Sequence, residues 1–77
     1  MVSAYVLIQT EVGKASHVTK AVGDIDGITG VDGVTGPYDV IARAEADDLD
    51  ALGKRIVMPI QEVDGVTRTL TCPVLQL

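Results

Sequence analysis

The residues best suited to recognising a small molecule lie in one short segment, Thr35-Gly36-Pro37-Tyr38-Asp39. Such a turn offers close approach to the backbone at Gly36, a rigid amphipathic ring at Tyr38 and a negative charge at Asp39. The same residue types also form ordinary turns, because glycine, proline and aspartate each favour turns for local reasons. The residues by themselves leave two interpretations open, a ligand site and a plain hairpin turn.

No group of side chains in the sequence predicts catalysis. His17 is the single histidine and has no serine, cysteine or second histidine at catalytic spacing, so we expect it to be solvated. Cys72 is the single cysteine, and we expect a small buried hydrophobe there rather than a nucleophile. One cysteine and one histidine cannot supply the four ligands of a structural zinc site. We therefore expect no catalytic residue, no metal site and no cofactor.

Two further sets of residues have structural explanations. A cation site could be built from three neighbouring acidic residues, Asp47, Asp48 and Asp50. A helix is expected to begin at these residues, however, and acidic residues are favoured at the start of a helix. Four glycines follow one another at intervals of three residues, which is not the GxGxxG arrangement of a nucleotide-binding turn between strand and helix. They are Gly27, Gly30, Gly33 and Gly36.

The length and composition of the chain predict one domain over residues 1–77 that associates with other copies. A chain of 77 residues supports a single hydrophobic core and is marginally stable alone. A lone cysteine excludes an intrachain disulfide, so further stability has to come from association. The aliphatic residues are mostly Val, Ile, Leu and Ala, and the β-branched ones suit a half-buried sheet.

The charge of the chain argues against some classes of partner. Acidic residues outnumber basic ones by 11 to 6, and the net charge is −5. Binding to nucleic acid or to anionic membranes requires a basic patch, so we expect neither. The N-terminus has no basic region followed by a long apolar stretch, so it predicts no signal peptide and no membrane span, and we expect a cytoplasmic protein.

Hydrophobic periodicity predicts a strand and a helix in the first third of the chain. Residues Ser3 to Thr10 are rich in β-forming side chains and predict a strand that ends before Gly13. A helix is predicted over residues 15–25, because apolar residues recur there at positions i, i+3, i+4 and i+7. These are Val18, Ala21, Val22 and Ile25.

The middle of the chain predicts a hairpin. Strands are expected over Ile28–Thr35 and Tyr38–Ala44, joined by a turn at Gly36-Pro37. A second turn signal, Asp32-Gly33, falls inside the first of these strands. Because the pieces on either side of it are too short for two hairpins, we expect a β-bulge at Gly33.

The last third of the chain predicts a second helix and a final strand. Asp47 or Asp48 can cap the helix, and Leu49, Leu52, Ile56 and Ile60 keep helical spacing. Pro59 removes a backbone hydrogen bond, so we expect the helix to kink or end near Val57 or Met58. The strand is expected over Val66–Leu77, with Pro73 confining it to a sheet edge or an irregularity.

These elements predict an α+β fold of the ferredoxin-like βαββαβ type. Residues 6–11 resemble residues 40–45, and residues 25–29 resemble residues 63–67, which indicates two matching βαβ halves. Right-handed crossovers then place both helices on one face of a four-stranded antiparallel sheet. The other face is left uncovered although its side chains are largely apolar, so we expect the protein to dimerise through it.

Several segments together resemble the effector-binding RAM domain of the Lrp/AsnC family of transcription regulators. They are the turn Thr35-Gly36-Pro37-Tyr38-Asp39-Val40, the helix start Asp48-Leu49-Asp50-Ala51-Leu52, and Gly65-Val66 followed by Thr67-Arg68-Thr69-Leu70-Thr71. The resemblance covers essentially the whole chain. Full-length members carry an N-terminal helix-turn-helix domain, which this chain lacks, so DNA binding is not implied here.

The resemblance implies what the turn binds. RAM domains of this family pair sheet to sheet, assemble into rings of dimers and bind amino acids in clefts between dimers. On this sequence it implies effector contacts from Tyr38 and Asp39, a loop backbone shaped by Gly36 and Pro37, and a contribution from a facing subunit. The segment that contains these contacts begins at Thr35, and the facing subunit contributes Thr67 or Thr69. An amino acid needs an acceptor for its ammonium and donors for its carboxylate, which Asp39, the loop backbone and the threonines supply.

Of three functions considered, we expect the first, and the other two are alternatives. The first is an amino-acid-binding regulatory module that forms a homo-oligomer and acts on transcription or amino-acid metabolism through partner proteins. The second is a small dimeric enzyme resembling the ferredoxin-like monooxygenases. Such an enzyme would need polar or aromatic side chains that point into a pocket between the sheet and the helices, and this sequence offers only Tyr5, Tyr38 and His17. The third is an assembly adaptor for full-length Lrp/AsnC regulators, which would bind no ligand.

Overall fold

The computed structural model describes all 77 residues, Met1–Leu77. Its first half contains β1 (Val2–Thr10), α1 (Ala15–Gly23), β2 (Ile28–Gly33) and β3 (Val40–Ala46). The second half contains one helical segment and a strand: α2 (Leu49–Leu52), η1 (Gly53–Val57), α3 (Met58–Gln61) and β4 (Val66–Pro73).

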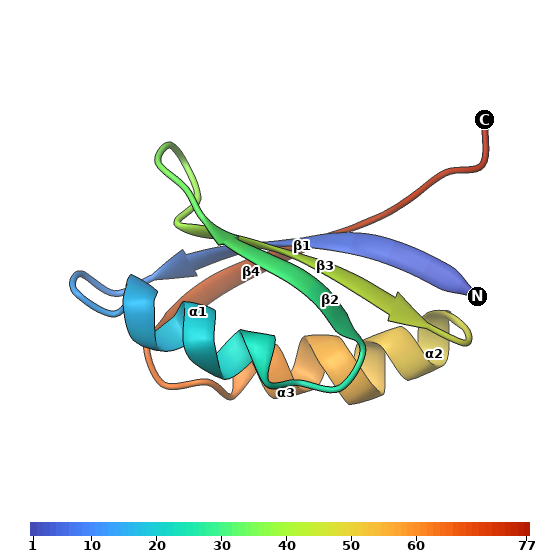
Figure 1. Cartoon of the computed structure of the whole chain (residues 1–77), viewed down its shortest axis with the longest axis horizontal. Helices are drawn as coiled ribbons and strands as arrows, with labels where there is room; N and C mark the ends of the chain where they lie inside the picture. The colour runs from blue at the N-terminus through green and yellow to red at the C-terminus, as the bar shows by residue number, and fades with distance from the viewer.

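The four strands form one sheet in the order β2-β3-β1-β4, and every neighbouring pair is antiparallel. Both helical segments lie against the same face of this sheet, and the opposite face carries no helix (Figure 1). This is the predicted ferredoxin-like arrangement. We call the face without helices the open face, and the other the covered face.

The covered face holds the hydrophobic core. Ala4, Val6 and Ile8 of β1 alternate along the strand and are 0% exposed, as the two-residue period of a strand requires. Eleven aliphatic residues make up the core, and no polar or charged residue is buried with them. The other core members are Val18, Val22, Val40, Ala42, Ala44, Leu52, Ile56 and Ile60.

The open face has an apolar centre with a polar neighbour. Leu7 pairs with Ile41 on β3 and with Leu70 on β4, so these three side chains form a row across the sheet. In the next row, Tyr5 pairs with Arg43, whose Nη1 donates a 2.7 Å hydrogen bond to the Tyr5 hydroxyl. The Arg43 guanidinium also lies 5.1 Å from the centre of the Tyr5 ring.

The second helical segment runs past the position where a kink or an end was expected. Asp48 caps it, and its carboxylate accepts a 2.8 Å hydrogen bond from the N–H of Ala51. The segment continues to Gln61 because η1 is a π-helical turn, in which the N–H of Met58 bonds to the carbonyl of Gly53. Pro59 then stands in the first turn of α3, where its missing N–H costs little.

Several element ends differ from those predicted. The first helix closes at Gly23, because the N–H of Asp24 already bonds to the carbonyls of Ala21 and Val22. In the hairpin, the first strand ends at Gly33 and the second begins at Val40, so the connecting loop is longer than a two-residue turn. The register shift of that strand lies between Ile28 and Gly30, so the bulge expected at Gly33 is wrong.

The last strand also ends earlier than predicted. It stops at Pro73 rather than Leu77, since proline has no N–H to continue the ladder. One further backbone bond, from Val74 N–H to the Ser3 carbonyl at 2.8 Å, follows it. Cys72 is exposed on the open face opposite Tyr5, so the expectation of a buried cysteine is wrong for the single chain.

The internal repeat reappears as two equivalent turns. Gly27 and Gly65 both have positive φ, of 100° and 98°. Each follows an aspartate in the connection from a helix to the next strand, α1 to β2 and α3 to β4. A Cβ at Gly27 would lie 2.7 Å from Ile56 Cδ1, and one at Gly65 would lie 2.7 Å from Lys14 Cβ. Each half of the chain therefore uses glycine where the turn packs closely against a side chain.

Candidate functional site

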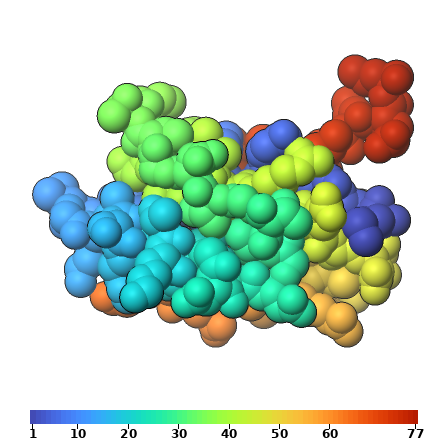
Figure 2. All heavy atoms as spheres, viewed as in Figure 1, coloured from blue at the N-terminus to red at the C-terminus, as the bar shows by residue number.

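The predicted ligand segment forms most of the loop between β2 and β3, residues 34–39, which we call the β2–β3 loop. It lies at one end of the sheet and rises on the open side, away from the helices (Figure 1). In Figure 2 this loop and the C-terminal residues stand above the rest of the molecule at opposite ends. The fold thus brings Thr35, Gly36, Pro37, Tyr38 and Asp39 together at one exposed end of the open face.

Asp39 is anchored to the end of β1. Its Oδ2 accepts hydrogen bonds from the backbone N–H of Thr10, at 2.8 Å, and from the Thr10 hydroxyl, at 3.3 Å. Its own N–H donates to the carbonyl of Ile8, and its carbonyl accepts from Val34, both at 2.9 Å. The carboxylate is half-buried, and its second oxygen, Oδ1, remains for another donor.

A second bond ties the loop to the same strand. Gln9 Nε2 donates to the carbonyl of Pro37 at 2.9 Å. Gly36 has φ of 128°, and a Cβ built there would meet no atom within 4 Å, so glycine serves the backbone conformation and leaves open space beside it. Tyr38 is half-buried. Gln9 and Thr10 were missed by the sequence analysis, and their only signal was a polar pair at the end of an apolar strand.

The two predicted threonines lie elsewhere on the chain. Both are on β4, which β1 and β3 separate from β2 in the sheet. Thr69 pairs with the core residue Ile8 and therefore points to the covered face, where its hydroxyl accepts a 3.2 Å bond from Gln61 Nε2. Thr67 lies at the register shift opposite the end of β1 and is exposed. Within one copy these residues do not join the β2–β3 loop.

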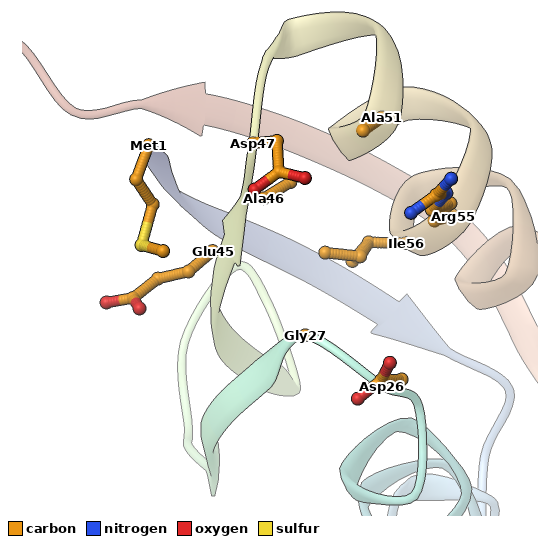
Figure 3. A pocket seen from close by; sticks show the side chains of 9 residues that line it. All are labelled: Met1, Asp26, Gly27, Glu45, Ala46, Asp47, Ala51, Arg55 and Ile56. Atoms are coloured by element: carbon orange, nitrogen blue, oxygen red, sulfur yellow. The ribbon is translucent and has the colours of Figure 1, made fainter.

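None of the surface depressions of the single chain includes the β2–β3 loop. One depression, of about 190 Å³, lies where β3 leaves the sheet for the second helical segment (Figure 3). Ile56 lies between the charged side chains of Asp26, Asp47 and Arg55 in this view. No buried side-chain polar atom lacks a hydrogen-bond partner, so no group there requires a ligand.

Two other kinds of site were sought in the structure. No three histidine, cysteine, aspartate or glutamate side chains come together in a group that could hold a metal ion. None of the helices has both the length and the apolar character needed to cross a membrane.

Comparison with known proteins gives close structural neighbours. No curated protein matches the sequence. The crystal structure of TTHA0845 from Thermus thermophilus is 28% identical, with a TM-score of 0.92 over 100% of this chain and 96% of that one. FFRP-DM1 is 28% identical, with a TM-score of 0.90 over 97% of this chain and 100% of that one.

A longer neighbour is described with a ligand. The feast or famine regulatory protein Rv3291c from M. tuberculosis, complexed with L-methionine, is 18% identical, with a TM-score of 0.81. The match covers 100% of this chain and 52% of that one, and at this identity it shows a shared fold. The family model of the Lrp/AsnC ligand binding domain matches residues 3–77. Because that match spans essentially the whole chain, the protein belongs to the Lrp/AsnC family through its ligand-binding domain.

Proposed function

We propose that residues 1–77 form a single amino-acid-binding regulatory module that works as a homo-oligomer and catalyses no reaction itself. The observation that carries this proposal is the match of residues 3–77 to the ligand-binding domain of the Lrp/AsnC family. A structural neighbour complexed with L-methionine supports an amino acid as the effector class. The module would act through partner proteins, including full-length Lrp/AsnC regulators, in transcription or amino-acid metabolism.

The effector site we propose is centred on the β2–β3 loop. Asp39 keeps one carboxylate oxygen unengaged while the other is held by Thr10, so the charge is fixed in position and open to an ammonium group. The backbone of Gly36 and Pro37 and the ring of Tyr38 lie on the same loop, which begins with Thr35. A threonine of β4, Thr67 or Thr69, would come from a facing subunit.

Self-association through the open face is supported by the distribution of charge. The open face of the strands carries two basic side chains, Arg43 and Arg68, and two acidic ones, Asp32 and Glu45. Their formal charges sum to zero, so the net charge of −5 lies on the rest of the surface. Two copies that meet through this face therefore bring together surfaces without net charge and keep the acidic remainder of each surface apart.

A catalytic role is disfavoured by the layer between sheet and helices. An enzyme with its pocket in that layer needs polar groups that point inward, whereas the buried residues here are all aliphatic apart from one glycine. His17 is exposed, as expected, and Tyr5 lies on the open face in contact with Arg43.

The proposal is tested by calorimetry with each of the common amino acids, followed by the substitution Asp39→Asn. Asparagine keeps an acceptor for the Thr10 N–H but removes the charge. A hydrogen bond to a charged group contributes on the order of 1.5–3 kcal/mol, so affinity should fall roughly ten- to a hundredfold. Asp24→Asn is the matched control, because Asp24 is an exposed aspartate at the end of α1, outside both the loop and the open face. Equal affinities of the two variants would contradict the site.

An assembly adaptor is the second candidate function, and one observation favours it. The β2–β3 loop lines no depression in the single chain, so a ligand cleft requires a second subunit. A thermal-shift screen separates the two functions. Stabilisation by at least one amino acid supports the effector module, and no response in a confirmed oligomer supports the adaptor.

We also propose that the module does not bind duplex DNA by itself. Four of its six basic residues lie outside the open face and are outnumbered there by acidic residues. Phosphate binding depends on a basic surface that releases counterions, which this surface lacks. A gel shift with the purified chain at physiological salt should show no complex, and a persistent complex would contradict the proposal.

A further inference from the structure

The four residues after β4, Val74–Leu77, form a segment that we call the C-terminal arm. The N–H of Val74 donates to the carbonyl of Ser3, which is the last backbone bond between this end of the chain and the sheet. Beyond that bond the arm rises on the open side, away from the helices (Figure 1). Figure 2 shows it standing clear of the other segments in that view.

The arm presents apolar side chains to solvent. Its sequence is Val-Leu-Gln-Leu, and Leu75 is 74% exposed and Leu77 fully exposed. Single exposed apolar residues are common on protein surfaces, but here two leucines project from one segment of four residues. Leu70 and Tyr5 of that face are also exposed, at 47% and 43%. Both the arm and the open face thus expose apolar surface that a second molecule could bury.

The length of the arm matches the thickness of a sheet-on-sheet interface. Four extended residues span at most about 13–14 Å. Two sheets that pack face to face lie about 10 Å apart. The arm rises on the side where a second sheet would lie (Figure 1), and when extended it is long enough to span that separation.

We propose that the C-terminal arm of each copy crosses to a second copy and packs Leu75 and Leu77 against the partner's apolar surface. This inference rests on the proposed association through the open face. The occupant is a second copy because the open face is apolar at its centre and electrically neutral, with two arginines and two acids on its strands, so two such faces meet without net repulsion. A two-fold pair forms the contact twice, so both arms clasp the dimer.

The double substitution Leu75→Ser with Leu77→Ser tests the arm. Neither residue belongs to the core, so the variant should fold. A fully buried leucine contributes enough that losing the contacts of both arms should weaken self-association at least about a hundredfold. The control is the pair Val12→Ser and Met58→Ser, which removes exposed apolar side chains, one in the β1–α1 connection and one on α3. Light scattering over a dilution series measures both.

A second measurement identifies which copy the arm contacts. In a mixture of isotopically labelled and unlabelled chains, intermolecular nuclear Overhauser effects from the leucine methyls of the arm should appear. Contacts only within one copy would show that the arm folds back on its own sheet and would overturn the inference. Dissociation of the arm variant no greater than that of the control would overturn it as well.

The experiments distinguish failure of the arm contact from failure of the proposed association through the open face. If Leu7→Glu dissociates the oligomer while the arm variant does not, association through the open face stands and the arm contact is wrong. If both variants keep the oligomer, the open face is not the interface, and the arm inference fails with it.

Discussion

The two faces of the sheet use the same strands for different purposes. Along β1, Val6 and Ile8 are fully buried under the helices, whereas Tyr5 is 43% exposed on the opposite side. Both faces carry large apolar side chains, but only one meets a helical layer within the chain (Figure 1). The difference shows that hydrophobic residues on a strand do not by themselves tell whether they serve folding or association.

The largest effect should come from the covered face. Ile8→Ala removes a side chain that is 0% exposed in the core, and such truncations cost about 2–5 kcal/mol of the free energy of unfolding. The neighbouring change Leu7→Ala should cost much less in folding. Chemical denaturation at several protein concentrations separates them, because the loss at Leu7 should depend on concentration and the loss at Ile8 should not. Concentration-dependent loss at Ile8 would contradict the division of roles between the faces.

The open face should respond to charge by dissociating. Leu7→Glu places a carboxylate in the row that Leu7 forms with Ile41 and Leu70, where a second sheet would bury it. An uncompensated buried charge costs about 3–5 kcal/mol, so the dissociation constant should rise more than a hundredfold while the monomer stays folded. Light scattering and circular dichroism measure the two properties. Val12→Glu, at a fully exposed position away from the sheet, is the control.

The turns below and above the sheet should differ in their tolerance of a methyl group. At Gly27, on the covered side, a Cβ would meet Ile56 Cδ1 at 2.7 Å and the Glu45 carbonyl oxygen at 3.0 Å. Gly36, on the open side, also has positive φ but has no atom within 4 Å of a Cβ. Both alanine variants carry backbone strain of about 1–3 kcal/mol, and only Gly27→Ala adds a clash. Thermal denaturation should therefore show the larger loss at Gly27, and equal losses would show that conformation alone decides.

The fold was largely predictable because the two periodicities of the chain are clear. In β1, buried side chains alternate with exposed or half-buried ones, and in α1 the buried Val18 and Val22 are one helical turn apart. Both patterns can be read from neighbouring residues in the sequence, because each element buries one side. The end of the second helix was not predictable, because Pro59 is tolerated through a π-helical turn at Gly53–Val57, whose hydrogen bonds depend on the packing of the whole segment.

The site was predictable only as a segment. Sequence identified Thr35 to Asp39 as the ligand segment but assigned only Gly36 and Pro37 to the turn, whereas the structure places all five residues in the loop between β2 and β3. The sequence did not reveal that Asp39 binds the end of β1 through Thr10, because residues 29 positions apart meet only once the sheet has formed. Whether Thr67 and Thr69 complete the site depends on a second subunit, which no pattern within one chain determines.

The smallest effect compares two aspartates that make the same kind of bond on opposite sides of the sheet. Asp48 accepts the N–H of Ala51, and Asp39 accepts the N–H of Thr10, each at 2.8 Å. Loss of a helix cap costs about 0.5–2 kcal/mol, and we expect Asp48→Ala and Asp39→Ala each to lower the free energy of unfolding by about 1 kcal/mol.

The two aspartate variants should nevertheless differ in ligand binding, which makes them a matched pair. Asp48→Ala alters only the helix start, so amino-acid affinity should stay unchanged in calorimetry, whereas Asp39→Ala should lose binding beyond what its stability loss explains. If Asp39→Ala abolishes assembly as well, the carboxylate is needed to hold the β2–β3 loop, and the turn is structural. If both variants bind equally well, the Asp39 carboxylate has no part in recognition. The effector site would then lie elsewhere on the open side, because Asp39 is the single acidic residue of the β2–β3 loop.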